Sequence, residues 1–207
     1  MNGLVRVIVV IVFSCASVLA WSEDLKQVIA DWEIANFTLD GDAQKQAFDA
    51  LLERAEALRS APTATAKNLL WAGIIESSYA GEIGGLNALG HAKQAKKDFE
   101  SALKADDPDV TPAALASLGT LHSKVPGWPI GFGNDKRASK FFEEAEQAGA
   151  ANLDFYMLYA EYALSKGDKE KALSLLQASE KVAPRSDRLI TDSARIAERA
   201  TYYERLN

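Results

Sequence analysis

The sequence predicts an all-α protein, a stack of about nine helices in antiparallel pairs with no β-sheet. Apolar residues recur at three- and four-residue spacing, as in Leu51, Ala55 and Leu58, which places them on one helical face. Helix breakers recur at intervals that suit helices of ordinary length. Small and aromatic residues recur at matching positions of successive helix pairs, which indicates internal repetition.

The breakers place the helices in chain order. They are Asp40-Gly41, Ala61-Pro62, Gly84-Gly85, Asp107-Pro108, Pro126-Gly127, Gly149, Gly167 and Pro184. The predicted helices are 23–38, 42–60, 63–80, 87–105, 111–124, 134–148, 152–166, 168–182 and 186–205.

Residues 1–20 differ from the rest of the chain. Arg6 is their only charged residue, residues 7–13 are a continuous apolar run, and Val18-Leu19-Ala20 has the small-residue pattern of a cleavage site. These features predict a secretory signal peptide and a periplasmic mature protein with no transmembrane segment. A second interpretation stays open, in which the mature protein is a lipoprotein anchored through Cys15.

The mature chain is acidic and has no cysteine. The full sequence has 23 basic and 29 acidic residues, and loss of Arg6 leaves a net charge of −7. An acidic surface disfavours nucleic acid, and no polybasic segment is present to attract anionic membranes. Without thiols the mature chain has no disulfide or zinc–thiolate site.

The glycines from Gly85 to Gly90 lack the Lys-Ser/Thr pair of a phosphate loop, so no cofactor is predicted.

Residues 21–207 are predicted to form one domain. It comprises an N-terminal helix pair at 21–62, three repeated units at 63–184 and a capping helix at 185–207, where a polar outer side is typical. The clearest unit is 152–184, with aromatic and small residues on its first helix, a Gly-Asp turn and a terminal proline. This unit resembles the tetratricopeptide repeat, which implies a short right-handed solenoid.

Two of the three units have a longer connection between their helices. The small residues expected to let paired helices approach closely lie twelve apart in the last unit (Ala160 to Ala172), nineteen in the middle unit (Gly119 to Ala138) and twenty-two in the first (Gly73 to Ala95). Inserted loops are therefore predicted at 80–90 and 125–133, at the same end of adjacent helix pairs. They contain seven of the thirteen glycines together with Trp, Phe and Ile, so they are expected to pack on something or bind something.

The candidate partner- or ligand-binding residues lie in and beside these loops. They are Tyr79, Glu82, Asn87, Trp128 and Phe132. Two interpretations of the aromatic pair stay open. Both rings pack over the ends of the helix pairs, or at least one of them faces a partner as a binding hot spot.

No catalytic site and no metal site are predicted. His91 and His122 are the only histidines and each lies near an inserted loop, so a metal site completed by Glu82 or Asp135 is the weaker interpretation. Isolated packed or exposed histidines are commoner. No nucleophile elbow or paired carboxylates accompany them, so the protein is not predicted to be an enzyme.

The amino-acid sequence of the loops resembles that of a family of exported bacterial tetratricopeptide proteins. The matching segments are Ser77–Glu82, Gly84–Leu86 and Pro126–Gly133. The resemblance implies fold and export but no activity. A looser resemblance is to the T component of TRAP transporters, a periplasmic helical-repeat lipoprotein associated with solute uptake.

A groove that binds peptide carboxylates, as in some tetratricopeptide domains, needs basic and amide residues. The residues predicted to face the groove are Ile74, Ser77, Ala116, Thr120, Met157 and Glu161, which do not supply such a clamp.

Taken together, these features predict a non-enzymatic binding or scaffold module of the bacterial envelope, holding a protein or peptide. The alternative is an accessory subunit that handles a small solute for a transporter. Assembly as a homo-oligomer stays open.

Overall fold

The computed structural model describes residues 15–206, and their side chains from residue 25 onward. Those residues form nine α-helices and no strand, which confirms the predicted all-α class. The helices are α1 (Cys15–Phe37), α2 (Gly41–Ser60), α3 (Ala66–Ile83), α4 (Ala88–Leu103), α5 (Thr111–Lys124), α6 (Asp135–Gln147), α7 (Leu153–Ser165), α8 (Lys169–Glu180) and α9 (Leu189–Leu206). Arg6 and the apolar run at 7–13 lie outside the described residues.

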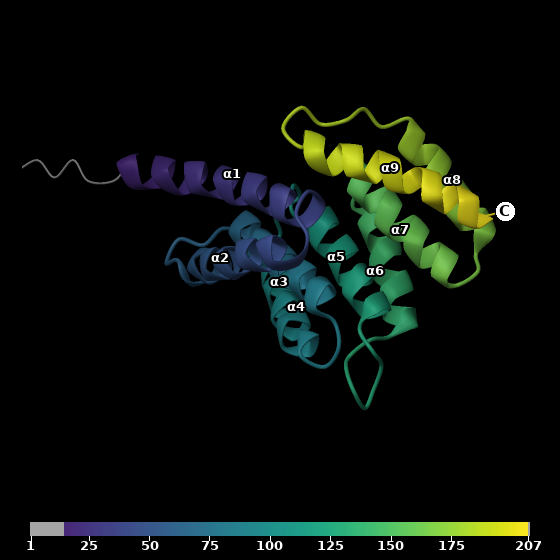
Figure 1. Ribbon diagram of the computed structural model, residues 1–207, viewed down its shortest axis with the longest axis horizontal. Coiled ribbons are helices and arrows are strands. Elements are labelled where there is room, and N and C mark those ends of the chain that lie inside the picture. Colours follow the sequence, from purple (N-terminus) through teal and green to yellow (C-terminus); the bar gives the residue numbers. More distant parts are fainter. Residues whose placement is uncertain (1–14, 207) are drawn as a thin grey trace, which may run out of the picture.

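The helices are arranged as successive antiparallel pairs. The tightest packing is within α3–α4, α5–α6 and α7–α8, the three pairs predicted to repeat. The first helices lie in order, because α1 packs against α3, α3 against α5 and α5 against α7. Figure 1 shows this progression from the purple N-terminal helix to the yellow C-terminal helix.

Short polar side chains begin several of these helices. Asn134 accepts a hydrogen bond from the backbone N–H of Arg137 at 3.0 Å, which caps α6. Asn152 caps α7 in the same way through Phe155, at 2.9 Å. Each cap satisfies a donor that would otherwise lack a partner in the first turn, so local sequence determines where these helices begin.

Two helix pairs are held together by the same contact between a glycine and a phenylalanine. A Cβ atom at Gly73 of α3 would lie 2.6 Å from the ring of Phe99 of α4. A Cβ atom at Gly119 of α5 would lie 3.0 Å from the ring of Phe142 of α6. Both rings are fully buried. The absence of a side chain on the first helix therefore lets the paired helices approach closely.

The last helix does more than cover the last pair. Helix α9 packs against α7 and α8, and it also contacts α1 at the other end of the chain. Ala116 and Met157, which were predicted to face an open groove, are buried in the same cluster as Tyr202 of α9. Helix α9 thus covers part of the face formed by the first helices.

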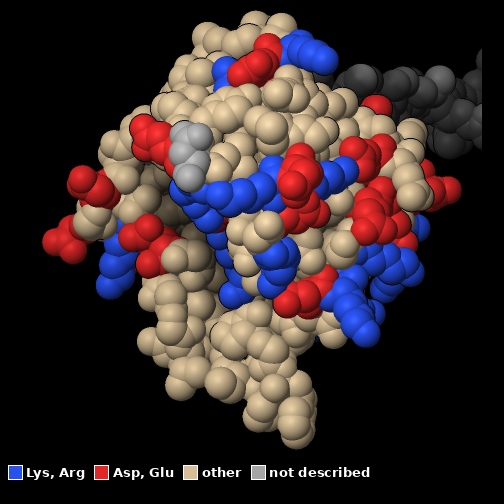
Figure 2. Space-filling model, turned by 90° about the vertical axis from the view of Figure 1, so that its right-hand side faces the viewer, with Lys and Arg blue, Asp and Glu red and all other residues tan. Residues whose placement is uncertain are grey.

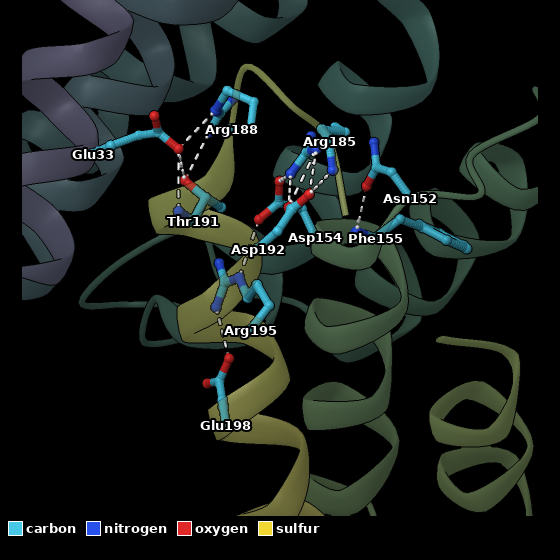
Figure 3. Close-up of polar contacts among 10 residues, drawn as sticks. All are labelled: Glu33, Asn152, Asp154, Phe155, Arg185, Arg188, Thr191, Asp192, Arg195 and Glu198. Atoms are coloured by element: carbon cyan, nitrogen blue, oxygen red, sulfur yellow. Dashed lines mark hydrogen bonds and ion pairs between the residues drawn. The ribbon is translucent and has the colours of Figure 1, made fainter. Parts of the chain in front are cut away.

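Charged residues join α9 to α1. Glu33 of α1 is buried and accepts hydrogen bonds from Arg188 Nε at 3.0 Å and from the Thr191 hydroxyl at 2.6 Å. The guanidinium of Arg188 also lies over the indole rings of Trp32 and Trp71, with centroid distances of 5.5 and 4.9 Å. Figure 3 shows Glu33 reaching from α1 toward Arg188 and Thr191.

A second set of charges joins α9 to α7. Asp154 of α7 accepts hydrogen bonds from Arg185 and Arg195 at 2.8 and 3.0 Å, and the buried Asp192 also contacts Arg185 (Figure 3). Burial by itself would raise the pKa of Asp154, but Arg195 and Arg185 outweigh it and hold that pKa below its ordinary value. We call the contacts of Glu33, Asp154, Arg185, Arg188, Thr191, Asp192 and Arg195 the α1–α9 joint.

One predicted loop is largely helical. Residues 80–90 were expected to be an inserted loop, but α3 continues to Ile83 and α4 begins at Ala88. Only residues 84–87 connect the two helices, with Gly84 and Gly85 at positive φ. The prediction was wrong because the breaker Gly84-Gly85 interrupts the helices only locally, and Gly81 and Gly90 are accommodated within exposed helical turns.

Candidate partner-binding site

The connections between α3 and α4 and between α5 and α6 lie at the same end of the molecule. We call this end, with residues 83–90 and 125–134, the loop end. Both connections project at the bottom of Figure 1, and the α5–α6 loop reaches farthest. The α5–α6 loop contacts the first turn of α4, because a Cβ atom at Gly131 would lie 3.4 Å from Cδ2 of Leu89.

The α5–α6 loop is held by its own backbone. Gly133 N–H donates to the carbonyl of Pro126 at 3.0 Å, and Gly131 N–H donates to that of Gly127 at 3.1 Å. A Cβ atom at position 133 would lie only 1.7 Å from the carbonyl oxygen of Val125, so no other residue fits there without a shift. The loop thus has a defined shape, and it includes a cis peptide bond between Trp128 and Pro129.

Phe132 fastens this loop to the helices. Its ring makes an edge contact with His122 of α5 at 5.3 Å between centroids, and the Lys96 ammonium of α4 lies 5.8 Å from its centroid. Phe132 is only partly exposed and packs on the core cluster of α3, α4 and α5. Its role in the structure is to anchor the loop.

His122 lies beneath the anchor and is fully buried. Its ring stacks on Phe141 at 5.4 Å, and neither ring nitrogen has a hydrogen-bond partner among the described residues. Burial lowers the pKa of His122, and the positive charges of Arg137 and Lys96 lower it further. The imidazole is therefore neutral at pH 7 and belongs to the packing of the loop.

Trp128 points away from this packing. Its side chain is 90% exposed, although tryptophan is usually buried in large part. Leu86, at 75%, and Ile130, at 56%, are also exposed at the loop end, and Ile83 is the fourth exposed large apolar residue there. We call these four side chains, Ile83, Leu86, Trp128 and Ile130, the apolar rim.

The apolar rim lies on a surface without charge. Figure 2 shows that the lowest part of the molecule carries neither Lys or Arg nor Asp or Glu, whereas charges of both signs cover the middle. A contiguous exposed apolar surface with a large aromatic residue at its tip is typical of a site that binds another molecule.

The other predicted site residues lie close to the apolar rim but differ in exposure. Glu82, in the last turn of α3, and Asn87, the last residue of the α3–α4 connection, are both exposed. Tyr79 is partly buried, and its ring packs against Phe48 and His91 at centroid distances of 5.9 and 4.8 Å. Glu82 and Asn87 are thus available to a partner, whereas Tyr79 supports the helices behind them.

Sequence reasoning missed three members of the apolar rim: Ile83, Leu86 and Ile130. The signal was present, since Leu86 stands between Gly85 and Asn87, where no helical face requires an apolar residue. Apolar residues in a glycine-rich turn have few neighbours to bury them.

The two histidines belong to different environments. His91 Nδ1 lies 2.7 Å from Glu76, which also pairs with Arg59 at 2.9 Å, and Arg59 pairs in turn with Asp98 at 2.8 Å. This cluster ties α2, α3 and α4 together. Within the described part of the chain, no group of three or more His, Cys, Asp and Glu residues could hold a metal ion.

Two open clefts lie on the surface of the described residues. One, with a volume of about 440 Å³, lies between the end of α1 and the start of α9 and is lined by Phe37, Thr38, Leu189, Ile190, Ser193 and Ala194. A second, of about 230 Å³, lies between α1 and α2. Neither is enclosed, and the first has no titratable side chain in its lining.

No model of a known protein family matches this chain, and no curated protein matches it significantly. Among the helices of residues 15–206, none has the combination of length and apolar composition needed to cross a membrane.

Proposed function

We propose that this protein is a non-enzymatic binding module of the bacterial envelope, and that it holds its partner through the apolar rim. Export rests on the features of residues 1–20, which predict a signal peptide. The binding role rests on the loop end. The observation that carries the proposal is the 90% exposure of Trp128 on a loop of defined shape.

The construction of the loop supports a binding role. Its glycines, its internal hydrogen bonds and the Phe132 anchor hold Trp128 out from the body without burying it. Because the loop is already ordered, it loses little conformational entropy when a partner covers the indole. A loop that only connected two helices would need neither the glycines nor the exposed ring.

The placement of α9 supports the same site. The face formed by the first helices would be the usual groove in the repeat family that this chain resembles. Here α9 covers part of it, and the Lys124–Glu161 ion pair crosses it from α5 to α7. The loop end has no such cover from the described residues.

The alternative proposal is an accessory subunit that handles a small solute for a transporter. Such a protein needs an enclosed apolar pocket with a few convergent polar groups. The cleft between α1 and α9 has a suitable volume of about 440 Å³, but it is open to solvent. The apolar rim therefore supports a binding module better than the clefts support solute handling.

Site-specific photo-crosslinking in intact cells tests the proposal. A photoreactive amino acid replaces Trp128, and in a matched control it replaces Leu173, an apolar residue of α8 that is 40% exposed and lies outside the loop end. We expect a discrete crosslinked product at position 128 and none at position 173. Equal crosslinking at the two positions, or none at 128, would contradict the proposal.

A further inference from the structure

Cations gather beside the apolar rim. Residues 84–97 and 125–140 contain six Lys and Arg and a single acidic residue, Asp135, although the whole sequence has more acidic than basic residues. Asp135 is paired with Lys166 at 2.6 Å. The nearest other carboxylates are Asp98, which is buried and paired with Arg59, Glu100, which is paired with Lys96, and the exposed Glu82 at the end of α3. The uncharged loop end is therefore bordered by two segments with an excess of positive charge, although the protein as a whole is acidic.

Four of these six cations make no ion pair within the described residues. They are Lys93, Lys97, Lys136 and Arg137, and all four are exposed. Lys136 and Arg137 lie in the first turn of α6, directly after the loop that carries Trp128. Lys93 and Lys97 lie within ten residues of the start of α4, which is at most about 14 Å along the helix axis.

The cations come from two helices, α4 and α6, that both border the α5–α6 loop. The Lys96 ammonium of α4 lies over Phe132 of the α5–α6 loop. Lys96 and Arg137 also act together on the buried His122, because both lower its pKa. Helices α4 and α6 thus present their cations at one end of the molecule. The sequence has no polybasic run, so this gathering arises only in the folded chain.

We infer that the loop end docks on a bilayer surface rich in anionic phospholipid, with Trp128 and its apolar neighbours entering the interface while the cations meet the phosphates. This inference rests on the proposed function and names the partner of the same site. Indole rings favour the boundary between water and hydrocarbon, because one edge is polar and the rest apolar.

The dimensions of the loop end suit such a surface. The uncharged tip extends beyond the charged body (Figure 2), so it enters the interface without burying a charge. The cations stand behind the tip, where long Lys and Arg side chains reach headgroup phosphates. A protein partner that used the apolar rim alone would have no need of unpaired cations on both α4 and α6.

Flotation with lipid vesicles tests the inference on the processed, soluble chain. Vesicles of phosphatidylglycerol mixed equally with phosphatidylethanolamine are compared with vesicles of phosphatidylcholine alone. We expect binding to the anionic vesicles only, weakening as salt is raised. Trp128 fluorescence should shift to the blue on binding, and Trp128→Ala should lose both the shift and most of the binding.

The double substitution Lys93→Gln and Lys97→Gln should weaken partition to the anionic vesicles roughly 30-fold, since each Lys near such a surface contributes about fivefold. The matched control is Lys67→Gln with Lys104→Gln. These exposed lysines, which also make no ion pair within the described residues, lie at the opposite end of the same helix pair and should have little effect.

Three outcomes would overturn the inference. They are equal binding to both kinds of vesicle, an equal effect of the two lysine pairs, and no binding at all. If the protein does not bind vesicles while crosslinking at position 128 captures a protein, the proposed binding module is supported and only the inference of a bilayer partner is rejected. If the protein neither binds vesicles nor gives a crosslinked product at position 128, the proposed function is rejected as well.

Discussion

The loop end and the α1–α9 joint place polar and apolar side chains in opposite ways. At the joint, charged groups such as Glu33 and Asp192 are buried, and each has several hydrogen-bond partners. At the loop end, Trp128 and Leu86 are exposed to water and have little packing around them. Each region departs from the usual distribution of residues between surface and interior.

The difference shows how each region can be stabilised. Buried charges are tolerated only when every one is paired, so the joint is sensitive to the loss of any partner. The loop end depends on backbone shape and on the Phe132 anchor, and its exposed side chains contribute little to folding. We therefore expect substitutions at the joint to change stability, and substitutions at the apolar rim to change binding.

The largest expected effect is at the joint. Glu33→Ala leaves Arg188 and the backbone and hydroxyl of Thr191 without their buried acceptor. Removal of one partner from a buried charge pair costs about 3–5 kcal/mol, which chemical denaturation should detect. The control is Glu56→Ala, an exposed ion-pair partner of Arg59 on α2, expected to change stability by less than about 1 kcal/mol. Equal effects would mean that the joint does not hold α1 to α9.

A smaller loss is expected when the backbone of the α5–α6 loop is crowded. Gly133→Ala places a methyl group against the carbonyl of Val125, and overpacking of this kind costs about 1–3 kcal/mol. Thermal unfolding should show the loss. Gly81→Ala is the control, because nothing lies within 4 Å of a Cβ there, and it should leave stability unchanged or raise it slightly. A stable Gly133→Ala variant would show that the loop is not held by this contact.

Acid should weaken the attachment of the loop through His122. Its pKa is lower in the folded protein than the ordinary 6.5, so the unfolded chain binds the proton more readily. Above about pH 6.5 the imidazole is neutral in both the folded and the unfolded chain, so its full contribution to stability is present. As the pH falls below that value, the unfolded chain binds the proton first, and the free energy of unfolding falls by at most about 1.4 kcal/mol per pH unit.

His122→Phe keeps a ring against Phe132 and Phe141 but removes the titration. Denaturation curves at a series of pH values should give a smaller acid-induced loss for this variant than for the parent. Arg137 and Lys96 oppose protonation and Glu100 favours it, so these groups must be unchanged in the comparison. Identical pH profiles would show that His122 does not control the acid response.

The smallest effect on stability is expected at the tip. Trp128→Ala should change the free energy of unfolding by less than about 0.5 kcal/mol, because the side chain is exposed. Phe132→Ala, only four residues later, removes a packed ring and should cost about 1–3 kcal/mol. Differential scanning calorimetry of the two variants separates the roles of these aromatics. A large loss for Trp128→Ala would mean that the indole is packed in solution.

The sequence determined the helices to within a few residues at most ends. Helix α5 runs over Thr111–Lys124, as its breakers predicted, and the caps Asn134 and Asn152 begin α6 and α7. These features are local, since periodicity, caps and turns act within a few residues. The positions of Gly73 and Gly119 also predicted where paired helices approach closely.

Only the tertiary structure decided which way the loop aromatics face. Trp128 and Phe132 stand in the same glycine-rich loop, yet one is exposed and the other packs on His122. Side-chain burial depends on neighbours from other helices, which local sequence does not specify. Contacts between Glu33 and Thr191, 158 residues apart, are likewise set by the whole stack. The same is true of the cations beside the loop end, because the fold places the start of α6 near α4 although these segments are far apart in the sequence.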